Sequence, residues 1–345
     1  MKTIKWIVDK HVNEQKDYPH ISQAAEFLNN NEVVAFPTET VYGLGANARS
    51  TEAVAKIFEA KGRPSDNPLI VHIGDRAQLP ALVKQINEKA EKLIEAFWPG
   101  PLTIIFEKQD GVFSDKVTAG LDTVGIRLPD HPVAMALIKE ADLPIAAPSA
   151  NRSGRPSPTT AKHVLDDLEG KIAGIVDGGA TGVGVESTVI DCTAETPVIL
   201  RPGGVSKEEI ESIIGPVEID AVLLSGEGAP KSPGMKYTHY APDAPLYLME
   251  GSPEKIQTLV DDKQKEGLKV GVLATEESKG IYSANVVIPC GSRKDLPTVA
   301  QSLYDVLRAF NEADLDMIVS EVFPRDGIGT AIMNRLEKAA GHRWL

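Results

Sequence analysis

The sequence predicts a protein with two α/β units, a twisted, mixed sheet flanked by helices and then a smaller unit of the same class. Short β-branched apolar runs alternate with segments of helical periodicity from about residue 20 to about residue 215. Such alternation is typical of α/β folds. A stretch rich in Gly and Pro at residues 216–245 interrupts this pattern, and a second alternating series starts at Leu246.

Each element of the first unit is predicted from its apolar pattern. Helices are expected where apolar side chains recur every three or four residues, and strands where a short apolar run is bounded by Gly, Pro or polar residues. In chain order these are a helix with the stripe Ile21, Ala24, Ala25 and Leu28, a strand at 33–36, a helix at 50–60, a strand at 69–73, a helix with Leu79, Leu82, Val83 and Ile86, strands at 102–106 and 123–128, a helix at 132–141, a strand at 144–147, a helix at 161–168, strands at 172–176, 188–192 and 198–200, and a helix at 206–214. We expect the strands to form one twisted, mixed sheet.

Capping residues support two of these helix starts, and a proline supports a third. Ser50 or Thr51 can cap the helix at 50–60, and Ser206 can cap the last helix of the unit. Pro132 stands at the start of its helix, where its missing N–H is not needed.

The second unit is predicted to begin after a linker. Residues 218–244 contain Gly- and Pro-rich runs that cannot sustain a helix or a central strand, so they are interpreted as an interdomain linker after a first domain at 1–217. Residues 245–345 then predict a small Rossmann-like domain. Its expected elements are a strand at 246–249, a helix at 253–266, strands at 269–274 and 286–288, a helix at 296–313, a strand at 317–322 and a helix at 331–340.

Composition narrows the possible functions. The formal net charge of −13 argues against a protein whose main task is to grip a nucleic-acid backbone, and favours a small anionic ligand held in a local cationic pocket. The two cysteines, Cys192 and Cys290, lie far apart and show no zinc-binding spacing, so both are expected to be buried free thiols. Neither a signal peptide nor a membrane-spanning run is evident, and we expect a cytoplasmic protein.

The loop from Lys61 to Pro68 is the most informative stretch. It carries two cations, Lys61 and Arg63, between a predicted helix and a predicted strand, and Gly62 and Pro64 shape it. Two interpretations are open. The cations can complement the dipole at the end of the helix, or they can clamp a polyanion such as the phosphates of ATP.

Three more loops follow predicted strands, which is where ligands bind in α/β sheets. Residues 36–45 carry hydroxyls such as Thr38, which suit either a polar ligand or turn chemistry. Residues 148–157 offer hydroxyls, an amide and two arginines, suited to phosphate or ribose oxygens or simply to a solvated loop. Residues 177–188 are rich in glycine, but they lack the Gly-Lys-Ser/Thr of a P-loop.

Isolated charged and titratable residues at strand ends complete the candidates. Arg127 and Arg201 either form ion pairs on the surface or line one shared pocket. His72 is either a buried core histidine or a residue that contacts a ligand. The sequence contains no nucleophile elbow, His-Glu-x-x-His zinc helix or Cys/His nucleophile arrangement. The pattern therefore indicates chemistry by positioning and charge stabilisation.

These motifs carry a family resemblance. The segment 36–45, the pair Lys61-x-Arg63, the pair Ser149-x-Asn151 and the segment 232–242 occur in this order. With them the whole chain resembles the two-domain form of threonylcarbamoyl-AMP synthases, in which a YrdC-like catalytic domain precedes an accessory domain. The resemblance implies synthesis of L-threonylcarbamoyl-AMP from L-threonine, bicarbonate or CO2, and ATP, with release of pyrophosphate. It also implies Mg²⁺ bound mainly through the ATP phosphates, with no protein metal site, and downstream proteins that transfer the threonylcarbamoyl group to tRNA.

The resemblance also implies roles for single residues. Lys61 and Arg63 would be catalytic. The residues that would contact ATP are Lys61, Arg63, Asn67, Thr123, Ser149, Asn151, Ser157, Arg201 and Tyr237. Those that would hold threonine are Thr38, His72, Arg127, Ala147 and Ser187, and Tyr237 in the linker would reach back over the site as a lid.

Other functions were weighed against this one. A double-stranded RNA-binding module is a rival because YrdC-like domains look like RNA binders, but the charge of −13 opposes it as the main role and leaves a weak RNA contact open. A carbamoyl transferase of the hydrogenase-maturation type shares the domain, but it needs further segments that this chain lacks. A purely regulatory binder does not account for the Lys-x-Arg and Ser-x-Asn pairs.

Overall fold

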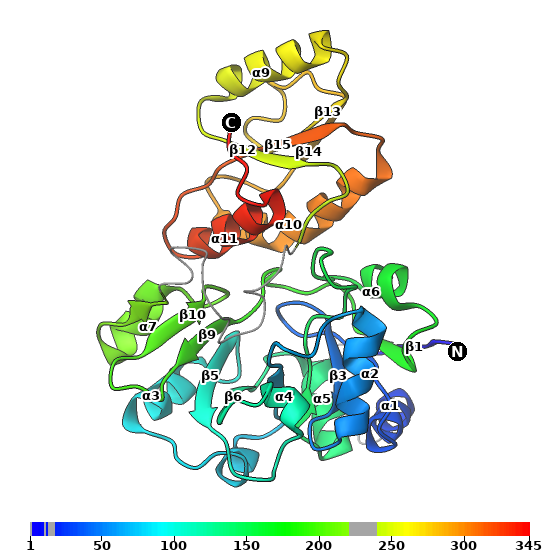
Figure 1. Cartoon of the computed structure of the whole chain (residues 1–345), viewed down its shortest axis with the longest axis vertical. Coiled ribbons are helices and arrows are strands. Elements are labelled where there is room, and N and C mark those ends of the chain that lie inside the picture. The colour runs from blue at the N-terminus through cyan, green and yellow to red at the C-terminus, as the bar shows by residue number, and fades with distance from the viewer. Residues whose placement is uncertain (1, 10–11, 13–17, 221–239) are drawn as a thin grey trace. The chain divides into compact units, whose positions relative to one another are not determined.

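The structure is a computed structural model of the chain, and it describes residues 2–9, 12, 18–220 and 240–345 (Figure 1). These residues form two compact units. The first contains the described residues up to 153, Pro158–Gly182 and 186–220, and the second contains Gly154–Ser157, Val183–Val185 and the residues from 240 onward. The predicted bounds at 1–217, 218–244 and 245–345 stay a prediction, since much of the predicted linker lies outside the described residues.

The first unit is built on a mixed sheet, as the sequence predicts. Its eleven strands, counted within the described residues, run in the order β1-β8-β2-β3-β7-β4-β6-β5-β9-β10-β11. Their bounds are β1 Ile4–Ile7, β2 Val34–Phe36, β3 Gly43–Asn47, β4 Ile70–His72, β5 Leu102–Glu107, β6 Thr123–Arg127, β7 Ile145–Ala146, β8 Gly174–Asp177, β9 Thr188–Asp191, β10 Val198–Arg201 and β11 Glu218–Ile219. The pair β4 and β6 is parallel, whereas β7 is antiparallel to both β3 and β4.

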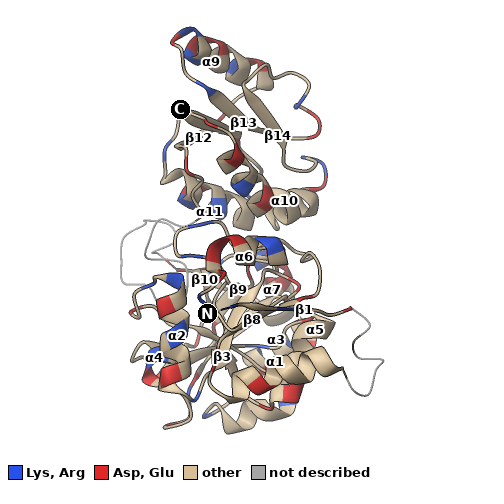
Figure 2. Ribbon diagram, turned by 90° about the vertical axis from the view of Figure 1, so that its right-hand side faces the viewer, with Lys and Arg blue, Asp and Glu red and all other residues tan. Residues whose placement is uncertain are grey.

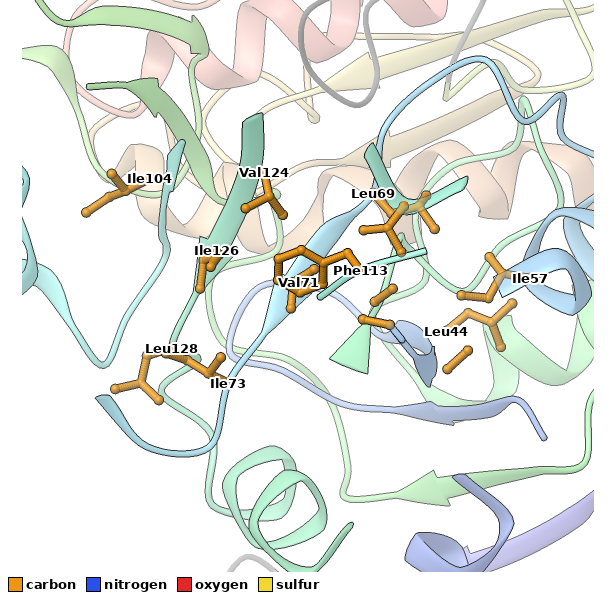
Figure 3. Close-up of a cluster of buried hydrophobic side chains, with 14 of the residues drawn as sticks. Leu44, Ile57, Leu69, Val71, Ile73, Ile104, Phe113, Val124, Ile126 and Leu128 are labelled. Atoms are coloured by element: carbon orange, nitrogen blue, oxygen red, sulfur yellow. The ribbon is translucent and has the colours of Figure 1, made fainter. Parts of the chain in front are cut away.

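Apolar side chains lie on both faces of the sheet, because successive residues of a strand point to opposite faces. Helices cover these apolar faces. In β2, Val34 and Phe36 belong to one apolar cluster and Ala35 to the other. Figure 3 shows the larger cluster, to which Leu44, Ile57 and Val71 belong. The helices of this unit are α1 Pro19–Asn29, α2 Thr51–Lys61, the 3₁₀ helix η2 Arg76–Ala81, α3 Glu88–Phe97, α4 Asp115–Thr118, α5 Pro132–Ala141, α6 Ala161–Leu168 and α7 Lys207–Ile214.

The second unit is a small parallel sheet in the order β12-β15-β13-β14, which confirms the predicted Rossmann-like character. Its elements are β12 Leu246–Met249, α9 Pro253–Lys265, β13 Val270–Ala274, β14 Val286–Pro289, α10 Leu296–Ala309, the 3₁₀ turn η3 Phe310–Glu312, β15 Met317–Glu321 and α11 Gly329–Ala340. Figure 1 shows α9 on one face of this sheet, with α10 and α11 on the other. Lys, Arg, Asp and Glu are interspersed along α9, as expected for a solvated helix face (Figure 2).

One predicted helix is wrong. The pattern of Leu79, Leu82, Val83 and Ile86 predicts a helix, but the chain forms only the short η2, which contains Pro80. Proline cannot donate an intrahelical hydrogen bond, so the α-helical pattern does not continue through it. The α-helix comes later, as α3, where the side chain of Asn87 accepts a hydrogen bond from the N–H of Ala90.

Other elements were not predicted, namely β1, β3, α3, α4 and β11. Strand β3 is hard to predict because glycine is unfavourable inside strands. Gly45 is nevertheless required there, because a Cβ would lie 2.7 Å from Phe36 and 2.9 Å from Ile145. Strand β11 pairs with β10, so Glu218 and Ile219, the first two residues of the predicted linker, extend the sheet. The remaining predicted elements agree with the structure within two residues, when η3 is counted as the continuation of α10.

Candidate active site

The side chain of Lys61 is a buried amine at the end of a helix. It is the last residue of α2, and Gly62 ends the helix in the left-handed conformation. Lys61 Nζ donates to the carbonyl oxygens of Ser149 and Asn151, the latter at 2.7 Å, and to Asn151 Oδ1 at 3.3 Å. Burial, followed by the charge of Arg63, holds the pKa of Lys61 well below its usual range. This lysine is therefore not a solvent-exposed decoration of the helix end.

The neighbours of Lys61 form one connected group. Arg63 Nη2 donates to the carbonyl oxygen of Asn67 at 3.3 Å, and the Arg63 guanidinium lies 6.0 Å from the ring centroid of Phe58. Ser149 donates from Oγ to Asn151 Oδ1 at 2.6 Å. Five of the residues predicted to contact ATP are thus brought together, namely Lys61, Arg63, Asn67, Ser149 and Asn151.

Arg127, at the end of β6, is buried among neutral and acidic groups. Its Nε donates to the carbonyl oxygen of Gly100 at 3.2 Å and its Nη1 donates to Thr40 Oγ1 at 3.0 Å. Its Nη2 lies 2.6 Å from Glu39 Oε1 in an ion pair. Arg127 is therefore not a surface ion pair, because only 5% of its side chain is exposed.

The hydroxyl of Thr38 serves the turn after β2. Its Oγ1 donates to the carbonyl oxygen of Val41 at 2.7 Å and accepts from the N–H groups of Thr40 and Val41. It also lies 2.8 Å from Thr40 Oγ1. Turn chemistry accounts for these contacts, and a contact of Thr38 with a ligand stays a prediction.

His72 is a buried, neutral histidine beside Arg127. The two residues are register partners at the ends of the parallel strands β4 and β6. Burial, helped by the charges of Arg127 and Arg201, lowers the pKa of His72 to about 3. Among the described residues, its Nδ1 has no hydrogen-bond partner. The imidazole therefore adds no positive charge to this part of the site at neutral pH.

Arg201 ends β10 and Ser187 precedes β9, so in the strand order both lie on the same side of β4 as Arg127. Arg201 donates from Nε and Nη2 to the carbonyl oxygen of Ser187, and Ser187 Oγ lies 2.8 Å from the hydroxyl of Thr103. Ala147 follows β7, where its N–H donates to the carbonyl oxygen of Ile70 at 2.9 Å.

Two of the three remaining candidates lie among the described residues. Thr123 lines a small pocket on the sheet with Pro68, Leu69, Ile70, Ile105, Leu121, Gly125 and Val189. Ser157 is buried, but it belongs to a segment that clusters with the second unit. Tyr237 lies outside the described residues.

Sequence reasoning missed several polar residues of this region. Glu39 lies between Thr38 and Thr40 in the segment 36–45, so the sequence shows its position but not its burial. Thr103 and Glu186 are buried polar residues whose nearness to Ser187 and Lys61 depends on strand pairing and loop packing. In the part of the chain that the structure describes, no group of three or more His, Cys, Asp and Glu side chains is arranged to hold a metal ion. None of the described helices is both long and apolar enough to cross a membrane.

The fold and the site define an α/β protein in which buried basic side chains and hydroxyls gather at strand ends and at the end of α2, an arrangement that suits a small anionic ligand. Two family models match the chain, "Telomere recombination" at residues 26–203 and "Threonylcarbamoyl-AMP synthase, C-terminal domain" at residues 205–341. The chain belongs to the threonylcarbamoyl-AMP synthase family.

Relatives match over the full length. The chain is 60% identical to the threonylcarbamoyl-AMP synthase of Bacillus subtilis (strain 168), with 99% of each chain covered. It is 48% identical to that of Pyrococcus abyssi (strain GE5 / Orsay), with 96% of this chain and 97% of the relative covered. The crystal structure of P. abyssi Sua5 complexed with L-threonine matches with a TM-score of 0.93 at 47% identity, with 99% of each chain covered.

Proposed function

We propose that this chain makes L-threonylcarbamoyl-AMP from L-threonine, bicarbonate or CO2, and ATP, with release of pyrophosphate, for the threonylcarbamoyl modification of tRNA. The 60% identity to a threonylcarbamoyl-AMP synthase over 99% of both chains supports this activity. The observation that carries the proposal at the level of residues is the buried Lys61, held by Ser149 and Asn151 beside Arg63. Two cations so placed suit the polyphosphate of a nucleotide.

The reaction needs no nucleophile from the enzyme. A carbamate on the nitrogen of threonine is itself an anion whose oxygen attacks the α-phosphorus, so that a new P–O bond forms while the bond to pyrophosphate breaks. Two anions must meet, and cations that offset their repulsion lower the barrier. Preorganised alignment of such reactants can contribute roughly 7–11 kcal/mol.

We assign the site residues in two groups. The ATP side consists of Lys61, Arg63, Asn67, Thr123, Ser149, Asn151, Ser157, Arg201 and Tyr237. The threonine side consists of Thr38, His72, Arg127, Ala147 and Ser187. Arg127 takes the substrate carboxylate, because a buried guanidinium can bind a carboxylate with two parallel hydrogen bonds.

Mg²⁺ is proposed to arrive with ATP. The ion usually keeps several waters and binds through substrate phosphates with one or two protein oxygens. The hydroxyl of Ser149 and the amide oxygen of Asn151 are oxygen donors beside Lys61, so the donor set suits a metal held mainly by the nucleotide. When bound, the metal would offset charge on the phosphates.

We place the chemistry in residues 1–217, with 218–244 as a connecting segment and 245–345 as an accessory domain. The product is expected to pass to proteins that transfer the threonylcarbamoyl group to tRNA, in the cytoplasm. A weak direct contact with RNA is compatible with these roles.

Pyrophosphate release tests the activity. The purified chain is incubated with ATP, Mg²⁺, L-threonine and bicarbonate, and each component is omitted in turn. Release is expected only in the complete mixture, together with a nucleotide product whose mass is that of threonylcarbamoyl-AMP. Release that persists without threonine would sink the proposal.

A further inference from the structure

Glu39 is a buried carboxylate that none of the roles above uses. Its side chain is 12% exposed, and its Oε1 lies 2.6 Å from Arg127 Nη2. The two groups form a close ion pair without hydrogen-bond alignment, since both oxygens of Glu39 and Arg127 Nη2 lack a hydrogen-bond partner among the described residues. A buried carboxylate without donors carries a desolvation penalty that a nearby cation offsets only in part.

The Arg127–Glu39 pair is positioned by two separate parts of the fold. Arg127 ends β6, and it donates from Nε to the carbonyl oxygen of Gly100 and from Nη1 to Thr40 Oγ1 in the loop after β2. Glu39 follows β2, and its carbonyl oxygen accepts from the N–H of Gly182 at 3.1 Å. Strands β2 and β6 are not neighbours in the sheet, so the pair does not arise from strand register.

An adjacent cation and anion are the complement of an α-amino acid. The substrate carries its carboxylate and its ammonium on one carbon atom, so a guanidinium that takes the carboxylate leaves the ammonium close by. We propose that Glu39 binds the α-ammonium group of L-threonine while Arg127 binds its carboxylate. This inference rests on the proposed function and assigns the amine subsite of that same site.

The surrounding charges suit a cation at Glu39. Burial and the negative charge of Glu39 raise the pKa of Asp130, which places that charge near the start of α5. Burial lowers the pKa of His131, and its Nδ1 accepts from the N–H of Val133. His72 stays neutral, so Arg127 is the cation in contact with Glu39 in the described part of the chain.

The amine subsite is tested by comparing the affinities of two ligands for two proteins. L-Threonine and its 2-hydroxy analogue, 2,3-dihydroxybutanoate, are titrated calorimetrically into the full chain and into Glu39→Gln. The analogue keeps the carboxylate and the side-chain hydroxyl but has no ammonium. We expect Glu39→Gln to weaken L-threonine about 10- to 100-fold, as for loss of a hydrogen bond between charged groups, and to change the analogue less than about twofold.

Two results would overturn the inference. An equal loss for both ligands means that Glu39 only orients Arg127, and no loss for L-threonine means that the amine binds elsewhere. Failure of the unmodified chain to bind L-threonine would instead overturn the proposed function, and this subsite with it. Glu39→Asp, which keeps the charge, is expected to retain part of the preference for L-threonine, so the test holds if Glu39→Gln folds poorly.

A matched control separates the subsite from a general loss of a glutamate. Glu32 forms an ion pair with Lys56 at 2.8 Å in the same unit. Glu32→Gln is expected to leave the affinities for both ligands unchanged. Circular dichroism and binding of a non-hydrolysable ATP analogue report whether each variant keeps its fold.

Discussion

Arg201 donates two hydrogen bonds to the carbonyl oxygen of Ser187, from Nε at 3.1 Å and from Nη2 at 2.9 Å. Its Nη2 also lies 3.1 Å from Ser187 Oγ. Arg201 ends β10 and Ser187 directly precedes β9, the antiparallel partner of β10. A residue assigned to ATP therefore holds the main chain of a residue assigned to threonine. We expect this contact to couple the two substrate sides of the proposed site.

Replacing this arginine by lysine should disturb both substrates. Lysine keeps the charge but cannot reproduce the planar fork that grips one carbonyl oxygen from two nitrogens. We expect Arg201→Lys to raise the KM for threonine as well as that for ATP, each by about 10- to 100-fold for the loss of about one hydrogen bond to a charged group. Initial rates with each substrate varied in turn measure the effect. A change confined to ATP contradicts the coupling, and Arg76→Lys on the surface is the control.

The cation pair should govern turnover rather than folding. Lys61→Ala and Arg63→Ala are each expected to lower kcat/KM by about 100-fold or more, because they remove charges that stabilise the transferring phosphoryl group. Their circular-dichroism spectra should stay folded. Lys56→Ala, in the same helix and paired with Glu32, is the control for loss of a lysine. Loss of the folded spectrum in both active-site variants would show that the two cations serve the structure instead.

ATP binding should draw a proton onto Lys61. Burial holds the pKa of this lysine well below its usual range, and the negative charge of a polyphosphate raises it again. Calorimetric titration of the ATP analogue at about pH 8, in two buffers of different ionisation enthalpy, measures proton uptake. The unmodified chain should take up more protons than Lys61→Met. Equal uptake by both proteins would mean that Lys61 does not change its protonation state.

The buried His72 should make the protein less stable in acid. Its pKa is lowered to about 3 in the folded chain, whereas an unfolded histidine titrates near 6.5. Between these two pH values the unfolded state binds more protons than the folded state. The stabilisation that neutral His72 gives is therefore present above pH ~6.5 and is lost as pH falls towards ~3. The free energy of unfolding falls by up to about 1.4 kcal/mol per pH unit in this range.

Urea unfolding at two pH values measures this contribution. The drop in the free energy of unfolding between about pH 7 and about pH 4.5 should be smaller in His72→Gln than in the unmodified chain. His20→Gln, on the exposed first turn of α1, should leave the drop unchanged. An unaltered drop in His72→Gln would show that other groups cause the acid sensitivity.

Gly45 should be intolerant of a methyl group. A Cβ there would meet Phe36 at 2.7 Å and Ile145 at 2.9 Å, so the core must shift to accept it. Gly45→Ala is expected to destabilise the protein by about 1–3 kcal/mol, as overpacking does. Gly280→Ala is the control, since a Cβ at Gly280 meets nothing within 4 Å. The thermal melting midpoints of the two variants measure this effect. Equal midpoints would contradict the packing argument.

The elements that could be predicted are those whose signal is local. The helix at 132–141 begins with a proline at the position where a missing N–H costs nothing, and its predicted bounds are those of α5. The helix predicted around Leu82 does not form. Leu82 is buried because it follows η2 in the fold, and not because it lies on the apolar face of an α-helix. Strand β3 could not be predicted, because its Gly45 is needed to leave room for the ring of Phe36. That ring comes from the neighbouring strand β2, so no local pattern shows it.

The candidate site divides in the same way. The Lys-x-Arg and Ser-x-Asn pairs could be recognised because each is a short local motif, but their contact joins residues 61 and 149, far apart in the chain. Glu39 was visible in its motif, yet its pairing with Arg127 depends on a loop after β2 reaching the end of β6.

By itself the sequence determined the α/β class, most helices and strands, the family and the loops that carry polar residues. These depend on periodicity, capping and short motifs, which act over a few residues. Only the tertiary structure decided that Lys61 is buried with a lowered pKa, that His72 is neutral and that Glu39 and Arg127 form a pair. Burial and electrostatic contact depend on which distant segments pack together, and no local pattern carries that information.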